Sequence, residues 1–368
     1  MLPVTKSICQ ITTVHPRYDV RIFQKICTSL ASEYQVNLIV ADGEGNEVIN
    51  NITIYDVGLR NVSRVKRIFI TSYKAYKKAI GLKCEVYHFH DPEFLFCALK
   101  LARKGMKVIY DVHEDVPKQI LSKVYLNPLT KMVFSRLILL IENFISARLF
   151  AVISVTSTIN ERFRKINFNS LVINNYPDIL HGGAIAYNLR NGICYIGIIS
   201  RIRGIREIIK LLDLLDVTLH LVGEFESEDF KTEIINNQNW NKVVYYGLLP
   251  YCKTIEIIRK SKIGMVTLLP EPNHIHSQPL KMFEYMSASL PVIASDFPVW
   301  KDIIEVNNCG ICVNPLDQDA ISGAISYLLR NPGIAESMGK NGEKAVREKY
   351  NWNSEKVRLS EFYRSVFL

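Results

Sequence analysis

The sequence lacks the short motifs that mark several common enzyme classes. It contains no G-x-S-x-G, no H-E-x-x-H and no P-loop, so the usual signatures of serine hydrolases, zinc proteases and P-loop nucleotide hydrolases are missing. No G-x-G-x-x-G follows the first strand-like segment, which removes the dinucleotide-binding fingerprint. No pair of acidic residues stands out as a double-displacement set. The chemistry must therefore be sought in groups that bind a ligand.

A long uninterrupted apolar run is also missing. The most apolar region, residues 132–155, is broken by Arg136, Glu142 and Arg148. These charges argue against a membrane-spanning helix, and the region predicts a buried helix followed by a strand at residues 149–153. The first residues lead into a strand without an export signal, and we therefore expect a protein of the cytoplasm.

Cysteine is present, but not in a metal-binding or disulfide pattern. The eight cysteines are scattered among apolar segments, which predicts reduced side chains in the core. Cys309 and Cys312 form a lone C-x-x-C, whereas a structural zinc site would need a second pair. We therefore expect neither a metal nor another cofactor.

Length and charge set the next limits. The chain has 368 residues, of which 48% are hydrophobic, enough for a packed core in two or three domains of about 150 residues each. Its net charge of +9 suits phosphorylated substrates, an anionic membrane surface or nucleic acid. Because no nucleic-acid-binding motif accompanies the charge, nucleic acid is not expected as a partner.

Strand-like and helix-like segments alternate along the chain, which predicts an α/β fold with parallel sheets. The alternation stops in a stretch that contains proline and glycine, and it then restarts. The predicted parts are a Rossmann-like domain at residues 1–177, a linker at 178–192, a second Rossmann-like domain at 193–350 and a C-terminal helix at 351–368.

Residues 277–298 predict a helix whose start faces a ligand. An apolar strand precedes them, and we expect Ser277 to cap the helix with Pro279 in its first turn. Such a start offers backbone N–H groups and partial positive charge to an anion, typically a phosphate. Glu284 lies two turns further on. It is either an ordinary solvated glutamate or an acceptor for the ribose hydroxyls of a nucleotide.

The string PLKMFEYM…PVIASDFP in this stretch resembles the nucleotide-sugar site of retaining, family-4-type glycosyltransferases with the GT-B fold. The resemblance implies two Rossmann-like domains that face a cleft, and a last helix that crosses back to the first domain. In that family two glutamates lie eight positions apart, and the second contacts the donor ribose. Glu284 matches the second glutamate, whereas His276 stands in place of the first.

The resemblance also implies cations that hold the donor diphosphate. Arg203 matches one of the family's two cations, and Ile198 replaces the other, for which Arg201 is a possible substitute. The nucleotide base is expected near Gly247. The donor-binding residues implied in this way are Gly197, Ser200, Arg201, Arg203, Gly247, His276, Ser277, Pro279, Leu280, Lys281 and Glu284.

Polar residues also follow the predicted strands of the first domain, where ligands of open α/β sheets bind. A lone histidine is more often structural, but the resemblance matches His113 to a cleft histidine that contacts the transferred sugar. We therefore predict catalytic roles for His113, Arg203 and Glu284. The other residues expected to line the cleft, unless their loops are simply solvent-exposed, are His15, Arg17, Asp19, Arg21, His90 and Asp91.

Acidic side chains are absent from residues 57–84, which contain eight lysines and arginines. Apolar residues recur there at close to helical spacing, which predicts a basic amphipathic helix. Each base near an anionic membrane contributes about 1 kcal/mol, so the segment favours reversible membrane binding. The alternative is an ordinary solvated helix face.

These features together predict a metal-independent, retaining glycosyltransferase that uses a UDP- or GDP-sugar. The expected acceptor is a lipid-diphosphate-linked saccharide of O-antigen, capsule or exopolysaccharide synthesis. That acceptor would place the enzyme on the inner face of the cytoplasmic membrane. Two alternatives are a GT-B nucleotide-sugar epimerase, which leaves the basic helix unexplained, and a non-catalytic nucleotide-sugar-binding subunit, which the substitution at His276 suggests.

Overall fold

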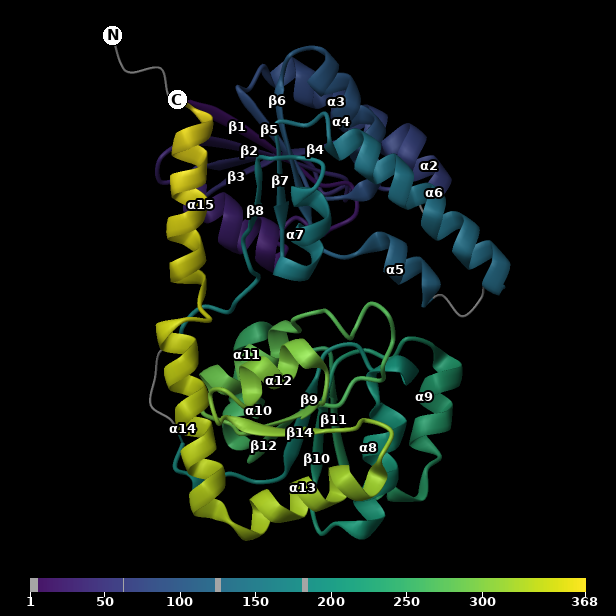
Figure 1. Cartoon of the computed structure of the whole chain (residues 1–368), viewed down its shortest axis with the longest axis vertical. Coiled ribbons are helices and arrows are strands. Elements are labelled where there is room, and N and C mark those ends of the chain that lie inside the picture. The colour runs from purple at the N-terminus through teal and green to yellow at the C-terminus, as the bar shows by residue number, and fades with distance from the viewer. Residues whose placement is uncertain (1–5, 62, 123–126, 181–184) are drawn as a thin grey trace. The chain divides into compact units, whose positions relative to one another are not determined.

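The computed structural model describes residues 6–61, 63–122, 127–180 and 185–368, which fall into two compact units. Unit 1 comprises Met1–Asn175 together with Asn353–Leu368, and unit 2 comprises Tyr176–Trp352. Each unit contains its own, largely parallel sheet (Figure 1). The α/β fold with two Rossmann-like domains is therefore confirmed.

The sheet of unit 1 has the strand order β3-β4-β2-β1-β5-β6-β7-β8. Its neighbouring strands pair in parallel, except that β3 pairs antiparallel with β4. The order reverses between β1 and β5, which makes this the topological switch point of the sheet. The strands are β1 (Ser7–Ile11), β2 (Gln35–Val40), β3 (Glu47–Ile49), β4 (Ile52–Asp56), β5 (Val86–Phe89), β6 (Lys107–Val112), β7 (Ala151–Ser154) and β8 (Ser170–Val172).

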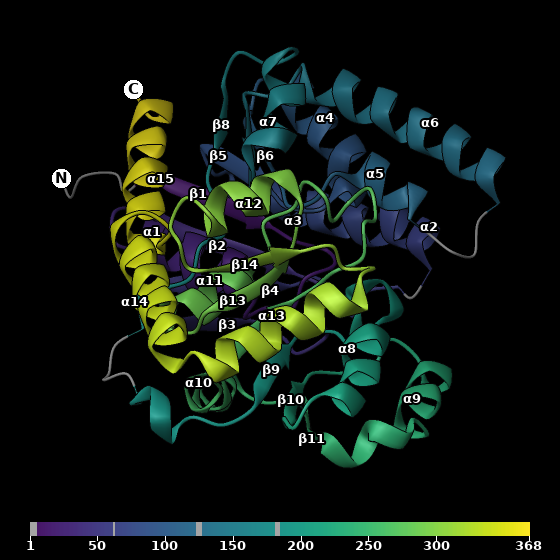
Figure 2. The same ribbon diagram turned by 60° about the horizontal axis from the view of Figure 1, so that its bottom comes forward.

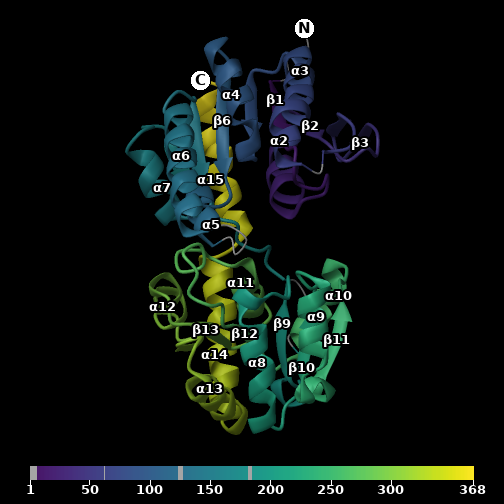
Figure 3. The same ribbon diagram turned by 90° about the vertical axis from the view of Figure 1, so that its right-hand side faces the viewer.

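Helices pack around this sheet (Figure 3). The central strands are rich in valine, isoleucine and leucine and are almost wholly buried, as expected for strands covered on both faces. The helices are η1 (Val20–Cys27, a π-helix), α1 (Thr28–Leu30), α2 (Arg64–Lys66), η2 (Arg67–Thr71), α3 (Ser72–Leu82), η3 (Pro92–Phe94), α4 (Leu95–Arg103), α5 (Val116–Leu121), α6 (Pro128–Ser146) and α7 (Ser157–Arg164).

The C-terminal helix α15 (Trp352–Val366) packs on unit 1. The hydroxyl of the buried Tyr363 lies 2.7 Å from Nδ1 of His88 in β5. The Lys107 ammonium at the start of β6 donates to the carbonyl of Val366 at 2.5 Å. The predicted return of the last helix to the first domain is confirmed.

The sheet of unit 2 is parallel throughout, with the order β11-β10-β9-β12-β13-β14 and its switch point between β9 and β12 (Figure 2). Its strands are β9 (Ile193–Ile196), β10 (Leu219–Val222), β11 (Val243–Gly247), β12 (Ile263–Val266), β13 (Val292–Ser295) and β14 (Gly310–Val313). Its helices are η4 (Tyr187–Leu189), η5 (Arg201–Arg203), α8 (Ile205–Leu211), η6 (Leu212–Leu214), α9 (Glu228–Ile235), η7 (Gln238–Lys242), α10 (Tyr251–Lys260), α11 (Leu280–Ser287), α12 (Pro298–Ile304), α13 (Gln318–Arg330) and α14 (Pro332–Glu348).

Helix α6 corrects one prediction, because it is not a buried helix. It packs against α4 and α5, while Glu142 and Ile145 near its end are buried. Its remaining surface exposes a series of large apolar side chains, each at least 48% exposed. They are Leu129, Met132, Val133, Phe134, Leu137, Leu140 and Phe144. No helix within the described residues is long and apolar enough to cross a membrane.

Candidate functional site

The first candidate site lies in unit 2, at the switch point between β9 and β12, where ligands of open α/β sheets bind. The loop after β9 contains Gly197 and Arg203, and the loop after β12 leads to α11. The two loops approach each other at Gly204, whose φ is 73°. A Cβ atom there would lie 2.1 Å from the carbonyl oxygen of Thr267, so this approach requires glycine.

Two cations converge beside Gly197. A Cβ atom on this glycine would lie 3.1 Å from Nζ of Lys281 and 3.5 Å from Nη1 of Arg203. The Lys281 side chain is 8% exposed, and its Nζ has no hydrogen-bond partner among the described residues. It lies 3.8 Å from the centre of the Tyr195 ring. Burial, and then the Arg203 charge, lower the pKa of Lys281 well below its usual range. An anion bound here would supply the missing acceptor.

Arg201 is engaged elsewhere. Its guanidinium forms an ion pair with Glu233 at 3.0 Å and lies 4.6 Å from the centre of the Phe230 ring. Its backbone N–H donates to the carboxylate of Glu226. Instead of Arg201, the structure places Lys281 of α11 next to Arg203.

The start of α11 differs from the capped helix expected from the sequence. The hydroxyl of Ser277 donates to the carbonyl of His274 at 2.9 Å, and Pro279 occupies the N-cap position without a side-chain hydrogen bond. The helix therefore begins at Leu280, and the prediction that Ser277 caps it is wrong. His276, which replaces the family's first glutamate, is half-buried in the same loop.

Glu284 is buried rather than solvated, with 8% of its side chain exposed. It interacts with Tyr251, the first residue of α10. Burial, and then the carboxylate of Glu284, raise the pKa of the Tyr251 hydroxyl, which hydrogen-bonds to that carboxylate. A carboxylate accepts about four hydrogen bonds, so this contact leaves acceptor capacity for a ligand. The interpretation of Glu284 as an ordinary solvated glutamate is wrong.

The remaining predicted donor residues lie around the same strand ends. The Ser200 hydroxyl is buried after β9 and has no partner among the described residues. Gly247 ends β11 with a φ of 65°, and a Cβ atom there would meet nothing within 4 Å. Leu280 is half-buried at the start of α11. The predicted donor residues thus follow strands that end at the same edge of the parallel sheet.

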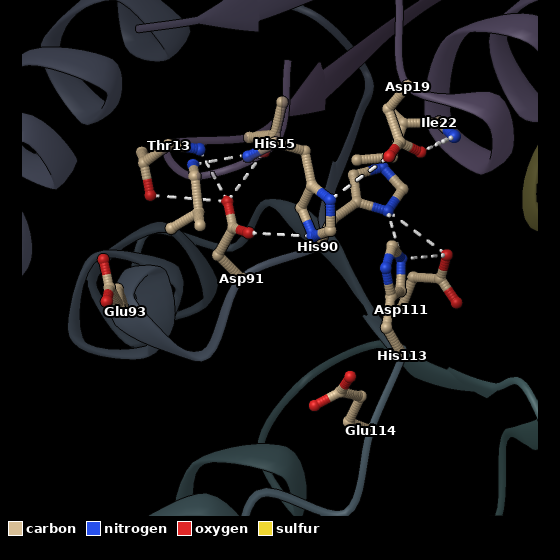
Figure 4. Close-up of polar contacts among 12 residues, drawn as sticks. Thr13, His15, Asp19, Ile22, His90, Asp91, Glu93, Asp111, His113 and Glu114 are labelled. Carbon is tan, nitrogen blue, oxygen red and sulfur yellow. Dashed lines mark hydrogen bonds and ion pairs between the residues drawn. The ribbon is translucent and has the colours of Figure 1, made fainter. Parts of the chain in front are cut away.

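The second candidate site is a polar cluster in unit 1, at the ends of β1, β5 and β6 (Figure 4). His15 lies between two carboxylates, with Nδ1 3.3 Å from Asp19 and Nε2 3.5 Å from Asp91. Because both ring nitrogens face carboxylate oxygens, the doubly protonated ring satisfies both contacts. Burial opposes this charge, but Asp19 and Asp91 outweigh it and raise the pKa of His15.

Asp111 is the centre of the other half of the cluster. It accepts hydrogen bonds from Arg21 at 2.7 and 2.9 Å. Its Oδ2 lies 3.1 Å from Nε2 of His113 and 3.2 Å from Nδ1 of His90 (Figure 4). Burial disfavours the carboxylate, yet Arg21 and His113 hold the pKa of Asp111 well below its usual range. A charged Asp111 therefore fixes the ring of His113.

Two predicted cleft residues are buried in ion pairs. Arg17 is 6% exposed and binds Asp42 at 2.7 Å, and Arg21 is 3% exposed and binds Asp111. Both arginines are held by carboxylates that lie far away in the sequence but next to them in unit 1. That Arg17 and Arg21 line the cleft stays a prediction.

The other predicted cleft residues divide into buried and partly exposed groups. Asp19 accepts the backbone N–H groups at the start of η1, and Asp91 accepts that of Thr13 at 2.5 Å. His90 is fully buried. His15 and His113 keep 31% and 16% of their side chains exposed. Asp19 is also partly exposed, at 21%, so these three side chains of the cluster are accessible to a ligand.

The cluster also contains a group with metal-ligand spacing. His88, His90 and Asp111 offer ligand atoms within 4.8 Å of one another. However, the guanidinium of Arg21 already neutralises Asp111, and His88 is held by Tyr363. The expectation that the protein uses no metal stays a prediction.

Solved structures with a similar fold include sucrose-phosphate synthase of Thermosynechococcus elongatus and the Anabaena protein HepE in complex with UDP. The first has a TM-score of 0.79 at 18% identity and covers 98% of this chain and 99% of that one. The second has a TM-score of 0.70 at 14% identity and covers 98% and 100%. At these identities the likeness shows the fold alone, which is the predicted GT-B arrangement of two Rossmann-like domains.

Two family models match the chain, one in each half. The model described as Glycosyltransferase Family 4 matches residues 20–178, and that described as Glycosyl transferases group 1 matches residues 186–345. The chain is a glycosyltransferase with the GT-B fold. An uncharacterised glycosyltransferase of Methanocaldococcus jannaschii is 25% identical over 167 residues, which are 44% of this chain and 42% of that protein. The match thus spans less than half of that relative.

The sequence did not reveal several residues of this glycosyltransferase that surround the predicted site. Tyr251 and Tyr195 come from elements that carry no recognisable motif, and only folding brings them to Glu284 and Lys281. Asp111 had a usable signal, because it lies at the end of a strand two residues before His113. The two-residue spacing did not predict that Asp111 is buried and contacts both His90 and His113.

Proposed function

We propose that this glycosyltransferase transfers a sugar from a nucleoside-diphosphate sugar bound to unit 2. The observation that carries the proposal is the buried Nζ of Lys281, which has no hydrogen-bond partner among the described residues and lies next to Arg203 at the switch point of the sheet. A diphosphate would supply negative charge beside both cations and the acceptor atoms that the Nζ of Lys281 lacks among the described residues. As the sugar leaves, the same cations would stabilise the charge that develops on the diphosphate.

The other donor contacts follow from the geometry around this pair. We propose that Glu284 binds the ribose, and that the base lies near the open side of Gly247. By the family resemblance, His113 of unit 1 contacts the transferred sugar, and transfer occurs with retention and without a metal. HepE has been solved with UDP and with UDP-glucose, which makes uridine nucleotides the first donors to test.

We further propose that the acceptor is a lipid-linked saccharide of surface-polysaccharide synthesis, and that unit 1 docks on the cytoplasmic face of the membrane. The support is the surface chemistry of two segments. Residues 57–84 carry eight bases and no acid, with Val65, Phe69, Ile70 and Tyr73 exposed. Helix α6 exposes the apolar series described above.

One experiment separates this proposal from its two rivals. The purified protein is incubated with labelled UDP- and GDP-sugars, with and without lipid-diphosphate-linked saccharides. A transferase releases nucleotide only when the acceptor is present, whereas an epimerase converts the sugar alone. Binding without turnover across the panel would instead identify a nucleotide-sugar-binding subunit, and a product that inverts the anomeric centre would contradict retention.

A further inference from the structure

The environment of Lys281 is unusual for a lysine. Its Nζ lies against the face of the Tyr195 ring and beside Arg203, with no hydrogen-bond acceptor among the described residues. An ammonium group has three N–H donors, all of which need acceptors when the group is buried. The titratable or charged groups that influence or adjoin the amine are Cys194 and Tyr195 of β9, Arg203 of η5, His274 of the preceding loop, and Glu284 of α11.

Charge on Lys281 is disfavoured in the empty site. Burial removes the solvation of the ammonium, and the neighbouring guanidinium of Arg203 repels it. Glu284 favours the charge, but its carboxylate accepts a hydrogen bond from Tyr251, and the Nζ of Lys281 has no hydrogen-bond partner among the described residues. The Tyr195 ring provides a weaker attraction than the hydration that was lost. Burial and the Arg203 charge therefore disfavour the ammonium form when no anion is bound.

A bound diphosphate reverses this balance, because it brings negative charge and several strong acceptor oxygens. We infer that Lys281 takes up one proton from solvent when a nucleoside diphosphate binds beside Gly197, and releases it when the nucleotide leaves. The inference rests on the proposed donor site. Arg203 is then the permanent cation of the site, and Lys281 is a cation that exists only together with the anion.

The direction of the pH dependence follows from the sign of the shift. The pKa of Lys281 lies below its usual value in the free protein and rises when the anion binds. At a pH between these two values, binding consumes a proton, so affinity falls as pH rises. The fall reaches at most tenfold per pH unit for one proton. Below the pKa of the free protein, the amine is already charged and this dependence disappears.

Calorimetry with UDP and with GDP at pH 8 tests the inference directly. The terminal phosphate of either nucleotide is already ionised at this pH, since phosphate groups of this kind have a second pKa of about 6. Measured binding heats are compared between buffers of different ionisation enthalpy, and the slope gives the number of protons exchanged. We expect the uptake of about one proton per nucleotide, and none for the nucleosides.

Variants of single residues show which side chain takes up the proton when the nucleotide binds. Lys281→Met should abolish the uptake and weaken nucleotide binding, with little effect on nucleoside binding. Lys253→Met is the matched control, because Lys253 is exposed on α10 and pairs with Glu256. His276→Gln should keep the uptake, which removes the nearby loop histidine as its source.

The possible failures are distinguishable. Nucleotide binding without proton uptake in the wild-type protein overturns the inference and leaves the donor site intact. Uptake that persists in Lys281→Met assigns the proton to another group and also overturns it. If neither UDP nor GDP binds, the proposed donor site itself is wrong. The wild-type buffer series remains decisive even if Lys281→Met does not fold.

Discussion

At the scale of single residues, variants of Glu284 and of its partner Tyr251 test whether Glu284 binds the donor ribose. We predict that Glu284→Gln weakens UDP binding by about 1–3 kcal/mol, because a neutral amide accepts weaker hydrogen bonds from ribose hydroxyls. Tyr251→Phe should weaken binding less, because it only releases the carboxylate that Tyr251 holds. Isothermal calorimetry with UDP measures both. Unchanged affinity in Glu284→Gln, with unchanged thermal stability, would place the ribose elsewhere.

The two arginines of η5 should behave differently. Arg203 lies beside the Nζ of Lys281, whereas the Arg201 side chain is already paired with Glu233. We predict that Arg203→Ala lowers transfer at saturating acceptor by at least tenfold, while Arg201→Ala changes it less than threefold, since an exposed ion pair contributes only about 0–1 kcal/mol. Steady-state transfer rates of both variants and the wild type, measured with the same donor, test this prediction. Equal and small losses in both variants would show that the diphosphate is bound elsewhere.

The sequence identified the residue types of the donor site better than their surroundings. Glu284 and Lys281 could be named because the PLKMFEYM string lies at a helix start. Their burial and their contacts with Tyr251 and Tyr195 could not be predicted, because both tyrosines come from other elements. Arg21 shows the opposite case, since a charged residue near a loop becomes the buried partner of a distant carboxylate. Long-range pairing of this kind leaves no local signal.

At the scale of elements, the strand ends of unit 1 are held together by charges that titrate. His15 lies between Asp19 and Asp91, and this position raises its pKa. A histidine whose folded pKa exceeds the unfolded value of about 6.5 stabilises the protein fully below that value. This stabilisation is lost as pH rises through the folded pKa.

We therefore predict a specific pH profile for the variant His15→Gln. The difference in thermal midpoint between the wild type and this variant should be largest at pH 6 and should shrink as pH rises towards 9. The reason is that His15 loses its positive charge as pH rises, and the neutral imidazole no longer forms ion pairs with Asp19 and Asp91. Differential scanning fluorimetry across this range tests it. A difference that stays constant with pH would mean that folding does not shift the pKa of His15.

The strand and helix order was predictable because the buried strands of a parallel sheet form nearly continuous apolar runs, as in β2. Element ends were less predictable. Helix α11 starts at Leu280 because Ser277 bonds to the preceding loop rather than to the helix. The sequence did not predict the exposure of α6. Its apolar composition suggested a buried helix, but a sequence does not show whether another element packs on that helix.

At the scale of the whole molecule, the basic charge and the exposed apolar side chains occur together in unit 1. Helices α3 and α6 both pack against α4. Lys66, Lys74 and Lys77 are exposed, whereas Arg67 is held by Glu93 at 2.9 Å. These three lysines are therefore among the exposed bases of the segment that can meet anionic lipid. Each contributes about 1 kcal/mol near such a surface, so binding should be reversible and sensitive to salt.

The last prediction separates the charged and apolar contributions to membrane docking. Replacing Lys66, Lys74 and Lys77 with Gln should release the protein from vesicles rich in anionic lipid at moderate salt. Replacing Leu137 and Leu140 of α6 with Ser should weaken binding even at low salt, because less apolar surface enters the interface. The matched control replaces the exposed lysines Lys253, Lys340 and Lys344 of unit 2 with Gln, which removes the same charge.

Co-sedimentation with vesicles measures binding, and transfer rates to lipid-linked and short water-soluble acceptors measure its consequence. Both unit 1 variants should lose activity towards the lipid-linked acceptor while keeping it towards the soluble one, since neither set of side chains belongs to the proposed donor site. The unit 2 control should behave like the wild type in both assays. If the control loses vesicle binding as much as the lysine variant, net charge alone attracts the protein and unit 1 has no dedicated docking surface.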